Sequence, residues 1–105
     1  MADFIPVANV RDLPPGTMRW VAVERERVLL ANVDGRIFAL RDACGHQRAP
    51  LSKGRLDGHS VECPLHFAQF DVRTGKLLNG PVSADVPTYE VRIEGDTVSV
   101  RRAGA

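Results

Sequence analysis

The sequence has no long apolar run, almost no excess charge and very little cysteine, and each of these shortages excludes a class of protein. No uninterrupted apolar stretch approaches the roughly 18 residues of a membrane-spanning helix, and no basic-then-apolar leader follows Met1. We therefore expect no membrane segment. The net charge is only +1, from 14 Lys and Arg against 13 Asp and Glu, and no basic run is interleaved with aromatic residues. A nucleic-acid-binding surface is therefore not expected.

A chain of 105 residues is long enough for one small domain with a modest core. Nothing of helical length shows a 3.6-residue period, whereas short strand signals alternate with turn signals. The pattern predicts an all-β fold of short antiparallel strands. Strands are expected at residues 4–8, 18–23, 28–33, 36–40, 60–62, 70–72, 76–78, 88–93 and 97–101. Asp34-Gly35 is a two-residue type I′ hairpin signal, and further turns are expected at residues 73–75 and 94–96.

The chemistry of the chain is concentrated in two short motifs, Cys44-Gly45-His46 and Cys63-Pro64-Leu65-His66. They hold both cysteines and two of the three histidines. Two thiolates with two imidazoles suit either zinc or an iron–sulfur cluster. Structural zinc sites usually pair two cysteines on one knuckle and two histidines on another, whereas each motif here carries one of each. The single residue between Cys44 and His46 favours binding to two neighbouring irons, with a zinc site as the alternative.

Other chemistry explains these residues less well. A two-histidine, one-carboxylate iron centre leaves both cysteines without a role, and a Cys–His nucleophile does not require the pair twice. His59, in a Gly-His-Ser turn, is expected to be a solvated side chain. Residues 25–27 and Arg101-Arg102 are expected to be solvated charge clusters.

The spacing of the two motifs, together with Phe70, Asp71, Gly75 and Gly80-Pro81, closely resembles the Rieske family. That resemblance implies a small antiparallel β-sandwich, one Rieske domain over residues 1–105, with an inserted cluster-binding subdomain at about 42–81. It also implies one [2Fe–2S] cluster held by two cysteines on one iron and two histidines on the other. The implied ligands are Cys44, His46, Cys63 and His66. Asp71 is expected to fix the second loop rather than to touch metal.

Two departures from the high-potential Rieske proteins indicate the subtype. Ala49 and Leu65 stand where those relatives carry an extra pair of cysteines joined as a disulfide. Ala68 and Phe70 stand where they carry a Ser and a Tyr whose hydroxyls donate to sulfur. Hydrogen bonds to sulfur favour the more negative reduced cluster, so their loss lowers the reduction potential. The resemblance is therefore to the low-potential ferredoxins of bacterial aromatic-ring-hydroxylating dioxygenase systems.

A cluster whose four ligand positions are filled has no open position for substrate, so we expect an electron carrier and not an enzyme. The resemblance implies two partners, an NAD(P)H-dependent flavoprotein reductase as donor and a terminal oxygenase as acceptor. The rim around the ligands is expected to consist of Gln47, Arg48, Pro64, Leu65 and Phe67. Because both cysteines belong to the motifs, no disulfide remains and a cytoplasmic location is expected. The alternatives are a small Rieske subunit of a nitrite-reductase-like complex and a zinc-stabilised interaction module.

Overall fold

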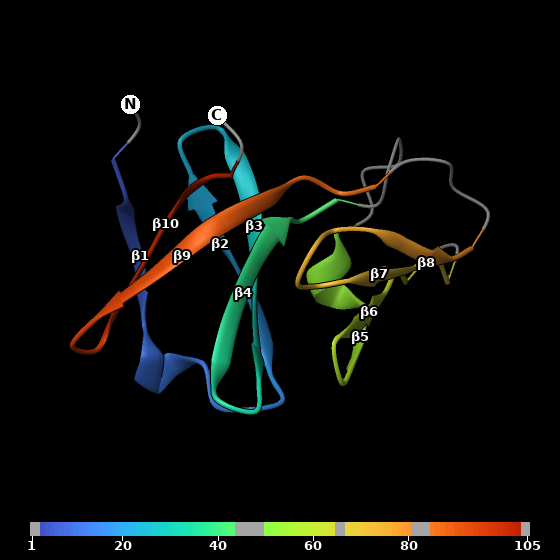
Figure 1. Cartoon of the computed structure of the whole chain (residues 1–105), viewed down its shortest axis with the longest axis horizontal. Helices are drawn as coiled ribbons and strands as arrows, with labels where there is room; N and C mark the ends of the chain where they lie inside the picture. Colours follow the sequence, from blue (N-terminus) through green and yellow to red (C-terminus); the bar gives the residue numbers. More distant parts are fainter. Residues whose placement is uncertain (1–2, 44–49, 65–66, 81–84, 104–105) are drawn as a thin grey trace.

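The computed structural model describes residues 3–43, 50–64, 67–80 and 85–103, which form two antiparallel sheets side by side (Figure 1). The larger sheet has six strands in the order β1-β10-β9-β4-β3-β2, and the smaller has four in the order β5-β6-β7-β8. Every described pairing is antiparallel. The prediction of an all-β antiparallel fold is confirmed.

The strands are short, as their turn spacing predicted. The large sheet contains β1 (Ile5–Asn9), β2 (Met18–Val23), β3 (Glu26–Val33), β4 (Arg36–Arg41), β9 (Thr88–Glu94) and β10 (Thr97–Arg102). The small sheet contains β5 (Arg55–Asp57), β6 (Ser60–Glu62), β7 (Gln69–Asp71) and β8 (Leu77–Asn79). Two 3₁₀ turns, η1 (Val10–Asp12) and η2 (Leu51–Lys53), complete the described elements.

The predicted hairpins are present, with small shifts in their bounds. Asp34 and Gly35 join β3 to β4 with φ values of 54° and 93°, as a type I′ turn requires. The β9–β10 turn is shorter than expected, because Glu94 still pairs with Thr97. Strands β7 and β8 each lie one residue away from the predicted positions. Strand β5 was not predicted, because three residues are too few to show alternation.

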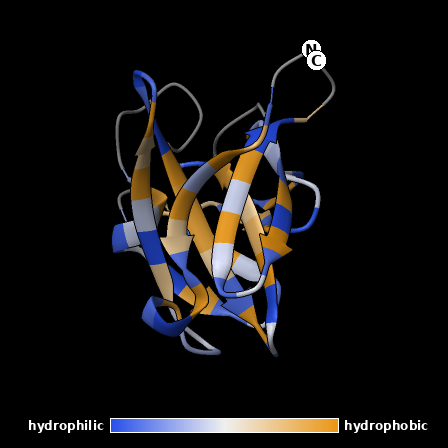
Figure 2. Ribbon diagram, turned by 90° about the vertical axis from the view of Figure 1, so that its left-hand side faces the viewer, coloured by the Kyte–Doolittle hydropathy of each residue, from blue (hydrophilic) through white to orange (hydrophobic). Residues whose placement is uncertain are grey.

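Strand β3 explains why the molecule has two separate cores. Its six consecutive residues Val28–Val33 are all buried, so both faces of this strand are covered. Since side chains alternate across a strand, Leu29, Ala31 and Val33 face one core, while Val28 and Leu30 face the other. Figure 2 shows, by contrast, hydrophobic and hydrophilic residues alternating along other strands of the large sheet.

The first core lies between the two sheets, and it positions the candidate site. It is completed from the small-sheet side by Leu51, Val61, Cys63, Ala68, Phe70, Val72 and Val86. The second core lies within the large sheet and includes Leu13, Ile37, Val98 and Val100. The apolar residues of the small sheet therefore pack against β3 and β4, and this packing holds the small sheet to the large one.

The small sheet is inserted in the chain between two strands that are neighbours in the large sheet. β4 pairs directly with β9 through Ala39–Tyr89 and Leu40–Thr88. The described elements between the end of β4 and the start of β9, from η2 to β8, thus lie to one side of that pair, on the right in Figure 1. In the part of the chain that the structure describes, no helix is long and apolar enough to cross a membrane.

Candidate metal centre

Of the four predicted ligands, Cys63 lies in the described structure, and Cys44, His46 and His66 lie outside the described residues. Cys63 directly follows β6 and is completely buried in the core between the sheets. It takes part in no disulfide. Burial at this position would keep water from a metal held there.

The second motif turns tightly between Cys63 and Ala68. The Cys63 amide donates to the Ala68 carbonyl at 2.8 Å, and the Phe67 amide donates to the Cys63 carbonyl at 3.1 Å. Phe67 adopts a left-handed conformation with φ of 58°, and its side chain is 66% exposed. A bulky residue in this region costs roughly 1–2 kcal/mol. The turn therefore directs Cys63 into the core and Phe67 into solvent.

Gly80 packs directly against this turn. A Cβ added at Gly80 would lie 2.5 Å from Ala68 Cα and 2.7 Å from Ala68 Cβ, and Gly80 has φ of 130°. Only glycine fits both the contact and the backbone conformation. Gly80, which the sequence analysis singled out together with Pro81, directly follows β8. A glycine is required there because the chain passes so close to the turn of the second motif.

The two ends of the first motif's segment are joined by side-chain bonds from Asp42. Its carboxylate accepts hydrogen bonds from the Ser52 amide and the Ser52 hydroxyl, each at 2.7 Å. It also pairs with Arg27 at 3.2 Å, and the Asp42 side chain is 0% exposed. Sequence analysis missed all of these roles and assigned Arg27 to a solvated cluster. Arg27 is exposed, as expected, but it is also paired, and its guanidinium lies 3.9 Å from the centre of the Trp20 ring.

Asp71 fixes the β7–β8 turn, and not the second cluster loop that the sequence suggested. Its carboxylate accepts from the Arg73 amide at 2.9 Å, and from Arg73 Nε and a terminal guanidinium nitrogen at 3.0 and 2.9 Å. The side-chain hydrogen bond from Arg73 holds the pKa of Asp71 below its usual range, and partial burial opposes that shift. This turn supports the strand that follows the second motif.

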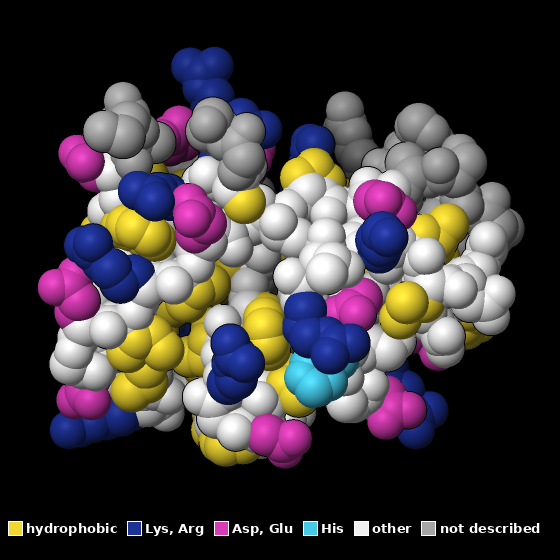
Figure 3. All heavy atoms as spheres, in the orientation of Figure 1, with side chains coloured by type: hydrophobic (Ala, Val, Ile, Leu, Met, Phe, Trp, Pro, Cys, Tyr) yellow, Lys and Arg dark blue, Asp and Glu magenta, His cyan; other side chains and the backbone are white. Residues whose placement is uncertain are grey.

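His59 is not the fully solvated side chain that its turn suggested. Its ring meets the Phe38 ring edge-on, with centroids 5.9 Å apart. Its carbonyl accepts from the Val72 amide at 2.8 Å, which ties the β5–β6 turn to β7. Figure 3 shows a face of the molecule on which basic and acidic side chains are interspersed.

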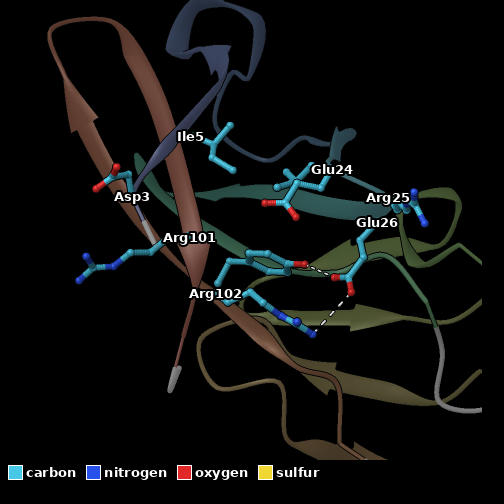
Figure 4. Close-up of a pocket in the computed structure, with 9 residues that line it drawn as sticks. Asp3, Ile5, Glu24, Arg25, Glu26, Arg101 and Arg102 are labelled. Atoms are coloured by element: carbon cyan, nitrogen blue, oxygen red, sulfur yellow. Dashed lines mark hydrogen bonds and ion pairs between the residues drawn. The ribbon is translucent and has the colours of Figure 1, made fainter. Parts of the chain in front are cut away.

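The structure also contains a cavity of about 270 Å³ on the large sheet, lined by charged side chains together with Ile5, Val23 and Tyr89 (Figure 4). Tyr89 donates its hydroxyl hydrogen bond to Glu26 there, and Arg102 pairs with the same carboxylate at 3.5 Å. Burial, followed by the hydrogen bond to Glu26, raises the pKa of Tyr89 to about 12. Both contacts are made by Glu26, which is therefore paired as well as partly solvated. Within residues 3–43, 50–64, 67–80 and 85–103, no three His, Cys, Asp or Glu side chains gather as a metal site.

The sequence model of the Rieske [2Fe-2S] domain matches residues 3–90. The chain belongs to this family. The ferredoxin component of the naphthalene 1,2-dioxygenase system of Pseudomonas aeruginosa is 39% identical over 92% of the chain and 93% of its own length. The biphenyl dioxygenase ferredoxin subunit of Pseudomonas sp. (strain KKS102) is 42% identical over 92% of the chain and 90% of its own length.

Solved Rieske structures agree with this assignment. The chain superposes on a chain from a complex of reduced oxygenase and oxidised ferredoxin in carbazole 1,9a-dioxygenase with a TM-score of 0.86. The two are 34% identical over 92% of this chain and 91% of that one. A structure described as a nitrite reductase (NADPH) small subunit has a TM-score of 0.79 at 23% identity over 95% of this chain and 99% of that one, which shows the fold alone.

Family membership confirms the prediction of one Rieske-type [2Fe–2S] cluster as the cofactor. It also argues against the zinc-stabilised module. The described residues fit such a group, since Cys63 offers a buried thiol and Ala68, Phe70 and Gly80 close tightly around its turn. The individual ligands Cys44, His46, Cys63 and His66 stay a prediction.

Proposed function

We propose that this chain is a Rieske ferredoxin that passes single electrons to the terminal oxygenase of a bacterial-type aromatic-ring-hydroxylating dioxygenase system. The observation that carries the proposal is the identity of 39% and 42% to ferredoxin components of two such systems, over at least 90% of each chain. The electrons would come from an NAD(P)H-dependent flavoprotein reductase. The proposed setting is the cytoplasm, where the nicotinamide nucleotide for that reductase is available.

The proposed ligand set is Cys44, His46, Cys63 and His66, within a cluster-binding subdomain at about residues 42–81. When bound, the cluster accepts and releases one electron. The protein's part is to hold it and to keep water from it, and Cys63 lies among the fully buried side chains of Val61, Ala68 and Phe70. Because the four ligands fill both irons, the chain itself is proposed to carry electrons and not to transform a substrate.

The experiment that tests the proposal is anaerobic mixing. Purified protein, reduced with one equivalent of dithionite, is mixed in a stopped-flow spectrometer with the terminal oxygenase of a naphthalene or biphenyl dioxygenase system. Oxidation of the ferredoxin at a rate that saturates with oxygenase concentration supports the function. A nitrite-reductase-like catalytic subunit is tested in parallel, because the alternative function is that of a small Rieske subunit in such a complex. Electron transfer to that protein and not to the oxygenase would overturn the proposal.

Phe67 is the described residue best suited to contact the oxygenase. It is the most exposed of the large hydrophobic side chains in the described structure, and its own main chain is hydrogen-bonded to that of the proposed ligand Cys63. Aromatic residues are enriched at the centres of interfaces. The strained backbone of an exposed aromatic residue is also typical of functional sites.

We expect Phe67→Asp to slow electron delivery to the oxygenase at least tenfold while leaving the visible spectrum of the cluster nearly unchanged. Aspartate adopts positive φ more readily than phenylalanine, so the variant is expected to fold at least as well as the wild type. The apolar contact is lost and a charge is placed in the interface, so the apparent dissociation constant measured by stopped-flow should rise. Leu65→Asp is expected to act in the same direction.

Ile93→Asp is the matched control, because Ile93 is also a large exposed hydrophobic residue, at 43%, but lies in β9 on the large sheet. It should transfer electrons at the wild-type rate. Unchanged delivery by both Phe67→Asp and Leu65→Asp would mean that docking occurs elsewhere on the molecule.

A further inference from the structure

The two cluster motifs lie in chain segments whose ends are joined in different ways. The turn that carries the second motif begins at Cys63 and ends at Ala68. These two residues are joined by a main-chain hydrogen bond of 2.8 Å within the β6–β7 hairpin. Such a bond survives substitution of either side chain. The segment with the first motif leaves the large sheet after β4 and returns at η2. Among the described residues, no main-chain hydrogen bond joins residues 41–43 to residues 50–54.

Side-chain bonds from Asp42 to Ser52 take the place of that missing main-chain link. One carboxylate oxygen accepts from the Ser52 amide and the other from the Ser52 hydroxyl, both at 2.7 Å. Bonds of this length to a charged acceptor are roughly twice as strong as bonds between neutral groups. The carboxylate is completely buried, so water does not compete for it.

Arg27 holds the same carboxylate to the large sheet. Its Nε and a terminal nitrogen lie 3.3 and 3.2 Å from the Asp42 oxygen that also binds the Ser52 hydroxyl. The Arg27 carbonyl accepts from the Asp42 amide at 2.9 Å. The guanidinium is in turn covered by the Trp20 ring, at 3.9 Å from its centre. A continuous set of contacts therefore runs from the edge strand β2 through β3 to both ends of the first cluster segment.

We propose that Asp42 is a positioning residue for the first cluster-binding loop. By bonding Ser52, Asp42 joins the two ends of that loop, and this link sets how long the protein retains its cluster. The proposal rests on the ligand assignment of Cys44 and His46 made above. Fixing the two ends of a loop reduces the conformations open to it, so its ligands stay near their bound positions after one metal bond breaks. A loop with free ends lets a detached ligand move away before it rebinds.

The test measures the rate at which the visible absorption of the purified, cluster-loaded protein decays in excess chelator at neutral pH. Ser52→Thr keeps both donors and should match the wild type within twofold. Ser52→Ala loses the hydroxyl bond and should lose its cluster several-fold faster. Asp42→Asn should be faster still, because its amide nitrogen faces the Arg27 donors. Asp42→Ala removes every bond of the carboxylate and should accelerate loss at least tenfold.

Asn32→Ala is the matched control. Asn32 is also buried and also bonds two separate segments, donating to the Leu13 carbonyl at 2.7 Å and accepting from the Gly35 amide at 2.8 Å, but neither segment carries a ligand. It should lower the urea midpoint of unfolding and leave the rate of cluster loss within twofold of the wild type. The electron paramagnetic resonance spectrum of the reduced cluster should change in the Asp42 variants and not in this control.

Two results would overturn the inference: Asp42→Ala losing its cluster no faster than Asn32→Ala, or Ser52→Ala losing it no faster than Ser52→Thr. The second comparison decides the matter even if Asp42→Ala does not fold. A wild-type protein that retains its cluster but reduces no oxygenase would instead overturn the proposed function and leave this inference intact.

Discussion

Cys63→Ala is expected to give a colourless protein that contains almost no iron and transfers no electrons. The wild type should contain about two irons and two acid-labile sulfides per chain. Cys63 is fully buried in the core that joins the two sheets, so no water-exposed side chain is positioned to replace it. Loss of the ligand also removes the centre proposed to join the two cluster loops, and metal binding contributes to the free energy of folding. Cys44→Ala should behave in the same way.

Val61→Ala separates loss of a ligand from loss of core packing. Val61 lies two residues before Cys63, at 0% exposure in the same core. Truncating it deletes more buried volume than Cys63→Ala does, at a cost of about 2 kcal/mol in the free energy of unfolding. The variant should be less stable but fully coloured. A wild-type protein with one zinc and no sulfide would refute the cluster and its ligands together.

Phe70→Tyr and Ala68→Ser are each expected to raise the reduction potential by tens of millivolts. Both residues are completely buried beside Cys63, and neither side chain has a donor to offer to sulfur. A donor aimed at sulfur stabilises the reduced state more than the oxidised state, because reduction adds electron density there. If one such bond gains about 1.5 kcal/mol on reduction, the potential of a one-electron couple rises by roughly 65 mV. The wild-type value should lie near the lower end of the range of about −150 to +300 mV.

The structure restricts where the new hydroxyls can point. Gly80 approaches Ala68 so closely that a serine hydroxyl has to turn away from Gly80. A buried hydroxyl that finds no acceptor costs about 1–3 kcal/mol, so each variant's urea midpoint reports whether a bond has formed. Protein-film voltammetry on the wild type and both variants measures the potential, with Phe4→Tyr, at the residue just before β1, as the control that should not shift it.

A wild-type potential near the top of the Rieske range would overturn the low-potential assignment. An unchanged potential in both variants, with no loss of stability, would show that main-chain amides and solvent exposure set the value. A loss of stability without a rise in potential would show that the hydroxyls point away from sulfur.

The choice of an iron–sulfur cluster over zinc was decided by the resemblance to the Rieske family. The sequence by itself determined the fold class, a soft metal centre and the places where the chain turns. These features follow from local chemistry. Two Cys/His pairs specify a soft metal centre wherever they meet, and Asp34-Gly35 permits the positive φ values of a tight hairpin in any context. The run Val28–Val33 was likewise recognised as a strand from its own residues, without reference to their partners. The ligand residues were also chosen from sequence, and they stay a prediction.

Only the tertiary structure decided which residues support those motifs. Asp42, Ser52 and Arg27 have no local signature, because each gains its role from a partner 10 or 15 positions away. The exposure of Phe67 and the burial of Cys63 depend on a turn that places two residues, four positions apart in the chain, on opposite sides of the core surface. Strand β5 exists because β6 pairs with it, and its three residues carry too little alternation to be recognised alone. Packing decides which distant segments come into contact. A single sequence gives the residues in order but does not show which of them meet in the folded chain.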